Sequence, residues 1–328
     1  MTAAATLPIE GGFPELGGAT AWLNSEPLTP ADLRGKVVVV QFCTFSCINW
    51  LRTLPYVRAW AEKYRDNGLV VIGAHSPEFP FEHNLEKIRS ALEAMGVDYP
   101  IAVDNDFAVW RAFDNAFWPA LYFVDAEGRI RHHHFGEEGY ERSERVIQRL
   151  LAEAGSDDVD EDLVSVEPSG VYLPADWNTL RSPETYVGYA RGTGFASPGG
   201  LKPDRSQDYH QPSHLGLNQW ALSGEWTVGS QITTLNKPGG RIVHRFHGRD
   251  LNLVLGTQAD GAPRRFRVLI DGEPPNDARG LDVDERGNGT VSEERLYQLI
   301  RQCGRITDRT FEITFIDAGA QAYVFTFG

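Results

Sequence analysis

The stretch Val37-Val-Val-Val-Gln-Phe-Cys-Thr-Phe-Ser-Cys47-Ile-Asn-Trp50 decides the fold of this chain. It begins with a continuous apolar run, typical of a strand buried on both faces, and beyond Cys47 apolar residues recur at helical spacing as far as Tyr64. Cys47 therefore stands at a strand-to-helix junction, where unpaired backbone N–H groups and the positive end of the helix dipole favour a thiolate. The sequence predicts a reactive sulfur at Cys47, and the alternative of a buried, inert thiol stays open.

The residue three positions after Cys47 is unusual for a redox motif. In a Cys-x-x-Cys pair the second sulfur stands at this position and closes a disulfide with the first. Here the position holds Trp50. Dithiol cycling through that pair is therefore excluded.

Strand and helix patterns alternate through the first half of the chain. Strands are expected at 36–42, 69–74, 120–124 and 129–135, and helices at 51–64, 85–95 and 140–154. This order predicts an α/β domain over residues 1–154. The acidic stretch 155–167 reads as a solvated linker.

Beyond the linker, short β-rich segments are separated by Gly, Pro and Asp turns. They predict an all-β sandwich, jelly-roll-like, over residues 168–328. The amphipathic stretch 292–302 is expected to be a short helix or a loop.

The composition excludes several classes of protein. A net charge of -14 argues against a nucleic-acid or anionic-membrane surface. We expect no membrane segment and no secretory signal, since the chain shows neither an apolar run of about 20 residues nor a basic, then apolar, N-terminus. As given, the chain is expected to be cytoplasmic. Three cysteines and an alternating His132-His133-His134 tract predict no disulfide scaffold, no metal site and no cofactor.

Several motifs carry a resemblance to a known family. The segment from Gln41 to Pro55, Trp118-Pro119 and Gly73-Ala-His-Ser-Pro-Glu-Phe79 resemble the thioredoxin-like domain of DipZ-type proteins in the wider TlpA group. Ser182-Pro-Glu-Thr-Tyr-Val-Gly-Tyr189 and Leu217-Asn-Gln-Trp-Ala-Leu-Ser-Gly224 resemble the family's appended β-domain, which is similar to carbohydrate-binding modules. The resemblance covers nearly the whole chain from about residue 10.

The resemblance implies a thiol–disulfide oxidoreductase with Cys47 as its nucleophile. It further implies a cis bond before Pro119, beside the sulfur, and an acid near the nucleophile, for which Glu78 and Glu82 are the candidates. The expected partners are a thiol or disulfide protein, or a small thiol such as glutathione. Gln41 stands where thioredoxins bury an aspartate, so that acid–base route is missing.

Three mechanisms fit a single nucleophile. In the first, an external thiol resolves the mixed disulfide on Cys47. In the second, Cys47 is peroxidatic, because Thr44-Phe-Ser-Cys47 matches the Thr-x-x-Cys element of peroxiredoxins, with Arg52 or Arg111 as the accompanying arginine. In the third, the domain is an inactive binding scaffold. Cys43 is either a partner of Cys47 in a disulfide or a small buried filler.

The aromatic residues of the β-domain have two interpretations. Trp177, Trp220 and Trp226 are expected either to stack on sugar rings or to fill the core. A carbohydrate partner at the β-domain is therefore one candidate. Fold resemblance alone does not establish it.

Overall fold

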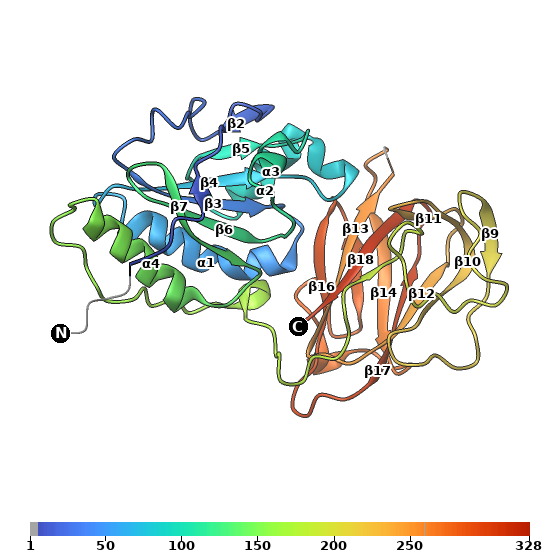
Figure 1. The fold of residues 1–328 in the computed structure, drawn as a ribbon. Helices are drawn as coiled ribbons and strands as arrows, with labels where there is room; N and C mark the ends of the chain where they lie inside the picture. The colour runs from blue at the N-terminus through green and yellow to red at the C-terminus, as the bar shows by residue number, and fades with distance from the viewer. Residues whose placement is uncertain (1–5, 259) are drawn as a thin grey trace. The chain divides into compact units, whose positions relative to one another are not determined.

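The computed structural model describes residues 6–258 and 260–328 (Figure 1). Residues 1–5, the start of the predicted first domain, and residue 259 lie outside this part. The chain divides into two compact units, with the boundary in the sequence between Leu173 and Pro174. Within the described residues, no helix combines the length and the apolar character needed to cross a bilayer.

Unit 1 is an α/β domain. Its strands are β1 (Gly11–Gly12), β2 (Ala21–Leu23), β3 (Val37–Cys43), β4 (Leu69–His75), β5 (Ile101–Val103), β6 (Ala120–Val124) and β7 (Arg129–Phe135). Its helices are α1 (Ile48–Lys63), α2 (Leu85–Ala94), α3 (Ala108–Ala112) and α4 (Tyr140–Glu153), with short 3₁₀ turns η1 (Pro80–His83) and η2 (Gly170–Tyr172). The predicted α/β fold class is confirmed.

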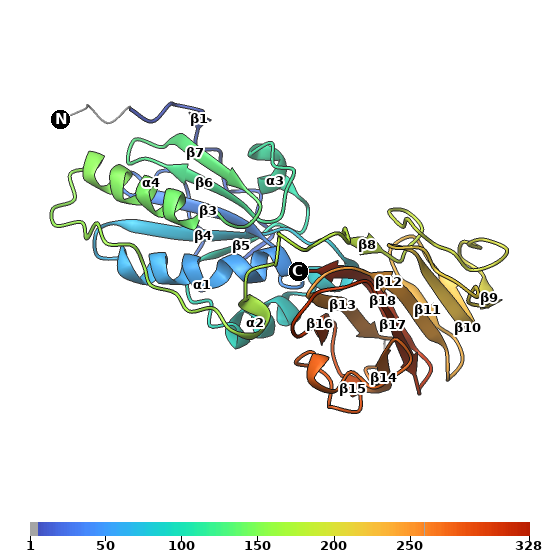
Figure 2. The same cartoon turned by 90° about the horizontal axis from the view of Figure 1, so that it is seen from below.

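The seven strands form one sheet in the order β1-β7-β6-β3-β4-β5-β2. β3 runs parallel to β4 and antiparallel to β6, so it sits at the centre of the sheet. All its residues are buried, as its continuous valine run predicts. Helices α1 and α4 cover one face and α3 lies on the other (Figures 1 and 2). Glu144 of α4 joins the two helices by accepting hydrogen bonds from Trp60 of α1 and from Tyr64, the C-cap residue of that helix.

The acidic stretch 155–167 is attached to unit 1. The backbone N–H of Val164 donates to Glu144 in α4 at 2.9 Å, and Arg145 donates to the carbonyl oxygen of Glu161 at 2.6 Å. Lys63 of α1 binds the carboxylate of Asp160 at 3.1 Å. Part of this segment is therefore held against α1 and α4 by hydrogen bonds and an ion pair.

Unit 2 is built almost entirely of antiparallel strands. They are β8 (Thr185–Tyr186), β9 (Ser206–Tyr209), β10 (Trp220–Val228), β11 (Thr233–Leu235), β12 (Arg241–Phe246), β13 (Asp250–Thr257), β14 (Arg264–Ile270), β15 (Asn288–Val291), β16 (Arg295–Arg301), β17 (Arg309–Phe315) and β18 (Ala320–Phe327), with one 3₁₀ turn η3 (Asn276–Ala278).

The strands of unit 2 form a large curled sheet because β10 is shared between its two halves. Residues Trp220 to Ser223 pair with β12, whereas Trp226 to Val228 pair with β11. Gly224 lies between these segments with φ at +94°, and a Cβ there would stand 3.0 Å from the Cα of Gly240. Only glycine adopts this bend readily, so it fixes where the sheet curls.

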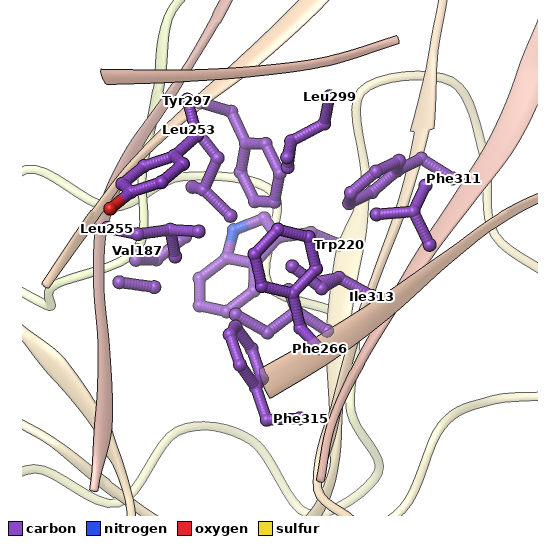
Figure 3. Packing of buried hydrophobic residues seen from close by; sticks show 14 of the residues in the cluster. Val187, Trp220, Leu253, Leu255, Phe266, Tyr297, Leu299, Phe311, Ile313 and Phe315 are labelled. Atoms are coloured by element: carbon purple, nitrogen blue, oxygen red, sulfur yellow. The ribbon is translucent and has the colours of Figure 1, made fainter. Parts of the chain in front are cut away.

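The curled sheet encloses an aromatic and aliphatic core, shown in Figure 3. The side chains of Trp220 and Trp226 are fully buried in it. Trp220 belongs to the same buried cluster as Phe266, Ile313 and Phe315, all labelled in Figure 3, and its ring centre lies 4.8 Å from that of Phe195. The expectation that Trp220 and Trp226 stack on sugars is therefore wrong for these two residues, whereas Trp177 has 47% of its surface exposed.

The stretch 292–302 also differs from expectation. It contains strand β16, which pairs with β13, and not a helix or loop. The strand is buried on both faces at its centre. Two-sided burial removes the alternation of apolar and polar residues that marks a strand in sequence.

Candidate functional site

Cys47 immediately precedes helix α1, as its N-cap residue. Its backbone is extended, with φ -77° and ψ 116°, and its carbonyl oxygen accepts the first helical hydrogen bond, from Leu51 at 3.0 Å. The side chain is partly exposed, while its neighbours Ser46 and Ile48 are buried. The sulfur therefore lies at the positive end of a 16-residue helix and within reach of solvent.

The loop before β6 lies against this sulfur. The bond between Trp118 and Pro119 is cis, as expected. The Sγ of Cys47 is 3.9 Å from the carbonyl oxygen of Trp118. Trp118 is in turn held by its indole N–H, which donates to the carbonyl oxygen of Ser76 after β4 at 3.0 Å. The structure thus brings Cys47 and the Pro119 loop together.

Glu82 fixes the loop that precedes Cys47. Its carboxylate is fully buried and accepts hydrogen bonds from the Ser46 hydroxyl at 2.6 Å and the Ser46 backbone N–H at 3.3 Å. The other oxygen accepts from the backbone N–H groups of Glu78 at 2.7 Å and Phe79 at 2.9 Å. Burial raises the pKa of Glu82, and the hydrogen bond from Ser46 offsets part of this effect.

Glu78, the second candidate acid, has a different environment. Its side chain is partly exposed, and its backbone N–H is one of the groups bound by Glu82. The two carboxylates predicted near the nucleophile are therefore not equivalent. Glu82 joins two chain segments, whereas Glu78 lies on one of them.

Cys43, at the end of β3, is buried. Like Cys47 and Cys303, it is a thiol and not part of a disulfide. Residues two apart on a strand share a face, so Cys43 lies on the same face as Gln41, whose amide donates to Thr53 of α1. Burial raises the pKa of the Cys43 thiol well above its usual range, and the nearby charge of Glu82 adds to the effect. This environment favours the protonated, unreactive form.

Position 50, where a second cysteine would stand, is filled by a buried tryptophan. Trp50 is fully buried, and its indole nitrogen has no hydrogen-bond partner within the described part of the chain. Gln41 stands in place of a buried acid and is neutral. Its amide N–H donates to the Thr53 hydroxyl at 2.8 Å, and its carbonyl oxygen accepts from the Tyr99 hydroxyl at 3.4 Å. The interior beneath Cys47 therefore offers neither a second thiol at position 50 nor a charged group at position 41.

His75 is a buried ionisable residue that the sequence did not single out. It pairs in register with Cys43 in the neighbouring strand and stacks on Phe45 with ring centres 5.7 Å apart. Neither ring nitrogen has a hydrogen-bond partner among the described residues. Burial lowers the pKa of His75 to about 3, so the imidazole is neutral at physiological pH. A histidine in an apolar strand end carries no distinguishing sequence pattern.

The two arginines proposed for a peroxidatic site are placed differently. Arg52 is buried in α1, and its guanidinium binds the buried carboxylate of Glu137 at 3.0 Å. Arg111, in α3, is exposed. The part of the chain that the structure describes also holds no group of three His, Cys, Asp or Glu side chains suited to a metal ion.

Comparisons with known proteins give matches in both units. Residues 18–133 match the AhpC/TSA family and residues 182–328 match the thioredoxin-like C-terminal domain. Protein DipZ of Mycobacterium tuberculosis is 35% identical over 283 residues, which are 83% of this chain and 38% of that protein. The chain therefore spans 38% of the length of the DipZ proteins it matches.

Two further matches concern unit 1. Thiol-disulfide oxidoreductase YkuV of Bacillus subtilis is 34% identical over 141 residues, covering 43% of this chain and 95% of that protein. The solution structure of a thioredoxin-like protein in its oxidised form is 35% identical and covers 44% of this chain and 96% of that one, with a TM-score of 0.41.

We predict that Glu82→Gln destabilises unit 1 by about 1–3 kcal/mol, because the new NH₂ group faces N–H or O–H donors and leaves them unsatisfied. Denaturant unfolding measures the change. Glu93→Gln, a change of the same kind at an exposed position, is the control and should alter stability by less than about 0.5 kcal/mol. Equal stability of the two variants would contradict the role given to Glu82.

We predict that His75 makes unit 1 less stable in acid. Its pKa falls from 6.5 to about 3 on folding, so between these values only the unfolded chain binds a proton on His75. Stability therefore decreases as pH falls through this window, by about 1.4 kcal/mol per pH unit from this group. His75→Phe should remove that slope, and the exposed His83→Gln should not. Denaturant titrations followed by amide NMR signals of unit 1 measure it; an unchanged slope in His75→Phe would refute the assignment.

Proposed function

Because the chain belongs to the thioredoxin-like thiol–disulfide oxidoreductase family, we propose that it catalyses thiol–disulfide exchange through a single sulfur, Cys47. One observation carries the proposal. Cys47 is partly exposed at the start of α1, with its Sγ 3.9 Å from the carbonyl oxygen of Trp118 in the cis-proline loop. This arrangement presents a nucleophile beside a backbone segment that an extended disulfide substrate can approach.

The proposed reaction has three exchanges. The Cys47 thiolate attacks one sulfur of a substrate disulfide, a Cys47–substrate disulfide forms, and the other substrate sulfur leaves as a thiolate. A first external thiolate then attacks the Cys47 sulfur of this mixed disulfide, so that the remaining substrate sulfur leaves as a thiolate and the external thiol is bound to Cys47. A second external thiolate attacks the sulfur of the bound external thiol and releases the Cys47 thiolate. Each cycle reduces one substrate disulfide and oxidises two external thiols to a disulfide. A small thiol such as glutathione, or a protein thiol, fills that role.

The need for an external thiol follows from the residues around Cys47. Trp50 occupies the resolving position and is fully buried. Cys43 is buried too, and the raised pKa of its thiol disfavours the thiolate that a resolving group requires. We therefore propose that Cys43 fills the interior and does not take part in the exchange.

The surrounding groups have supporting roles in this proposal. Pro119 shapes the loop whose Trp118 carbonyl oxygen faces the sulfur. Glu82 is a positioning residue, because its carboxylate holds Ser46 and the Glu78–Phe79 segment. Glu78, which is partly exposed, is the better placed of the two acids to exchange a proton with solvent.

The position of Arg52 favours disulfide exchange over peroxide reduction. A peroxidatic thiolate is assisted by a nearby arginine, but the guanidinium of Arg52 is bound by the buried Glu137 carboxylate. Its charge is already offset. Hydroperoxide chemistry at Cys47 is therefore an outcome that the next experiment distinguishes.

We predict that oxidised glutathione converts the wild-type protein to a stable adduct on Cys47, seen by intact mass and peptide mapping. Cys47→Ser should give no adduct at that site, and Cys43→Ser should give the wild-type adduct. Trp50→Cys, once its native fold is verified by circular dichroism, should release the glutathione and lose two hydrogens, because it restores a resolving thiol.

Three results would contradict this proposal. Spontaneous loss of the adduct from wild type but not from Cys43→Ser would show that Cys43 resolves it. An added oxygen after hydroperoxide treatment, with no glutathione adduct, would indicate peroxidase-like chemistry. If neither oxidised glutathione nor hydroperoxide modifies Cys47, the interpretation of the domain as an inactive binding scaffold is supported instead.

A further inference from the structure

We infer that an open cleft in unit 2 binds a small organic anion bearing a carboxylate or phosphate group. The cleft has a volume of about 600 Å³ and lies between three segments of the chain: residues 176–181, His247 at the end of β12, and the loop 304–308. This volume lies within the range of about 300–1,000 Å³ found for small-molecule sites. All lining residues belong to unit 2.

Two arginines line the cleft without carboxylate partners. Neither Arg181 nor Arg305 forms an ion pair with a described residue, and both are exposed. The guanidinium group offers a planar set of donors that matches a carboxylate or a phosphate. In a chain of net charge -14, these two arginines are cations of the cleft that no carboxylate of the described chain binds.

His247 adds an oriented donor. Its side chain is only 10% exposed, and its Nδ1 lies 2.6 Å from the carboxylate of Asp308. This contact holds the ring and leaves Nε2 as the nitrogen available to a ligand.

The cleft also contains two carboxylates, and both are engaged. Asp308 is bound by His247 and lies 3.5 Å from the guanidinium of Arg245. Asp176 accepts a hydrogen bond from the Thr179 hydroxyl at 2.7 Å. The charge of Asp308 is therefore partly offset by Arg245, while the carboxylate of Asp176 is occupied by a neutral hydroxyl, and neither carboxylate forms an ion pair with Arg181 or Arg305.

The three segments of the cleft are tied together before any ligand arrives. The backbone N–H groups of Arg181 and Ser182 donate to the carbonyl oxygen of His247 at 3.0 and 3.1 Å. The Ser182 hydroxyl in return accepts from the His247 backbone N–H at 2.8 Å. Gln302, which is buried, donates to the carbonyl oxygens of Gly248 and Thr307. A framework fixed in this way lowers the ordering cost of binding.

A second cleft, in unit 1, provides a contrast. It is lined by Arg58, Arg65, Glu62 and Asp98 among others. There Arg65 already binds Asp98 at 3.3 Å, and Arg58 donates to the carbonyl oxygen of Met95 at 3.0 Å. The arginines of this second cleft already have partners within the protein, so we expect an anion to bind more weakly there.

The test is isothermal titration of the full chain with inorganic phosphate, glucuronate and glucose, at constant ionic strength. We expect saturable binding of at least one of the two anions and none of glucose. The double variant Arg181→Gln/Arg305→Gln should weaken anion binding about tenfold or more, since each charge-assisted hydrogen bond is stronger than a neutral one. Arg205→Gln, at an exposed arginine outside the cleft, is the matched control and should bind as wild type.

Three outcomes would overturn the inference. The first is that neither anion binds saturably. The second is that the double variant binds them as the wild type does. The third is that glucose binds as tightly as glucuronate, that Trp177→Ala abolishes this binding and that the double variant retains it. This result would identify a neutral sugar site at the exposed Trp177.

Discussion

The buried carboxylate of Glu82 is the interaction on which the site depends. It binds Ser46, which precedes the nucleophile, and the backbone of Glu78 and Phe79, which follow β4. A buried charge is tolerated only where hydrogen bonds replace its lost hydration, and Glu82 has four of them. Because Ser46 is held, Cys47 enters α1 at a fixed place, facing the Trp118 carbonyl oxygen.

Unlike Glu82, the buried side chains around Cys47 at positions 41, 43, 50 and 75 are neutral, which supports the proposal that one sulfur carries the chemistry. Gln41 and Trp50 bear no charge, burial keeps Cys43 protonated, and His75 is a neutral imidazole. A dithiol enzyme needs a second sulfur that ionises during its cycle. In the proposed mechanism a thiol from outside supplies that step, and the fold supplies the position, the partial exposure and the helix terminus of the first sulfur.

The strands β3, β4 and β6 of unit 1 were predicted because they are continuous apolar runs, and β7 was predicted from its alternating pattern. The short α3 and the strands β1, β2 and β5, of two or three residues each, were missed, since elements of this length leave no periodic pattern. The strand β16 was mistaken for a helix or a loop because it is buried on both faces. The shared strand β10 was not foreseen either, since its bend depends on the approach of Gly224 to Gly240.

The candidate site was predictable as residue types but not as contacts. The strand-to-helix junction identified Cys47, and the resemblance identified the cis bond before Pro119. The hydrogen bond between Ser46 and Glu82 joins residues 36 positions apart, and no local pattern encodes it. The burial of Trp220 and Trp226 likewise depends on the curled sheet, so sequence alone left sugar stacking and core packing open.

Site-resolved alkylation of the native protein at neutral pH tests most directly the central claim that Cys47 is the reactive sulfur. The three cysteines differ in environment: Cys47 is partly exposed at a helix start, Cys43 is buried and Cys303 is exposed. The account predicts that Cys47 reacts faster than the more exposed Cys303 and that Cys43 is protected until the protein unfolds. A Cys47 that reacts more slowly than Cys303, or that is protected as Cys43 is, would contradict it.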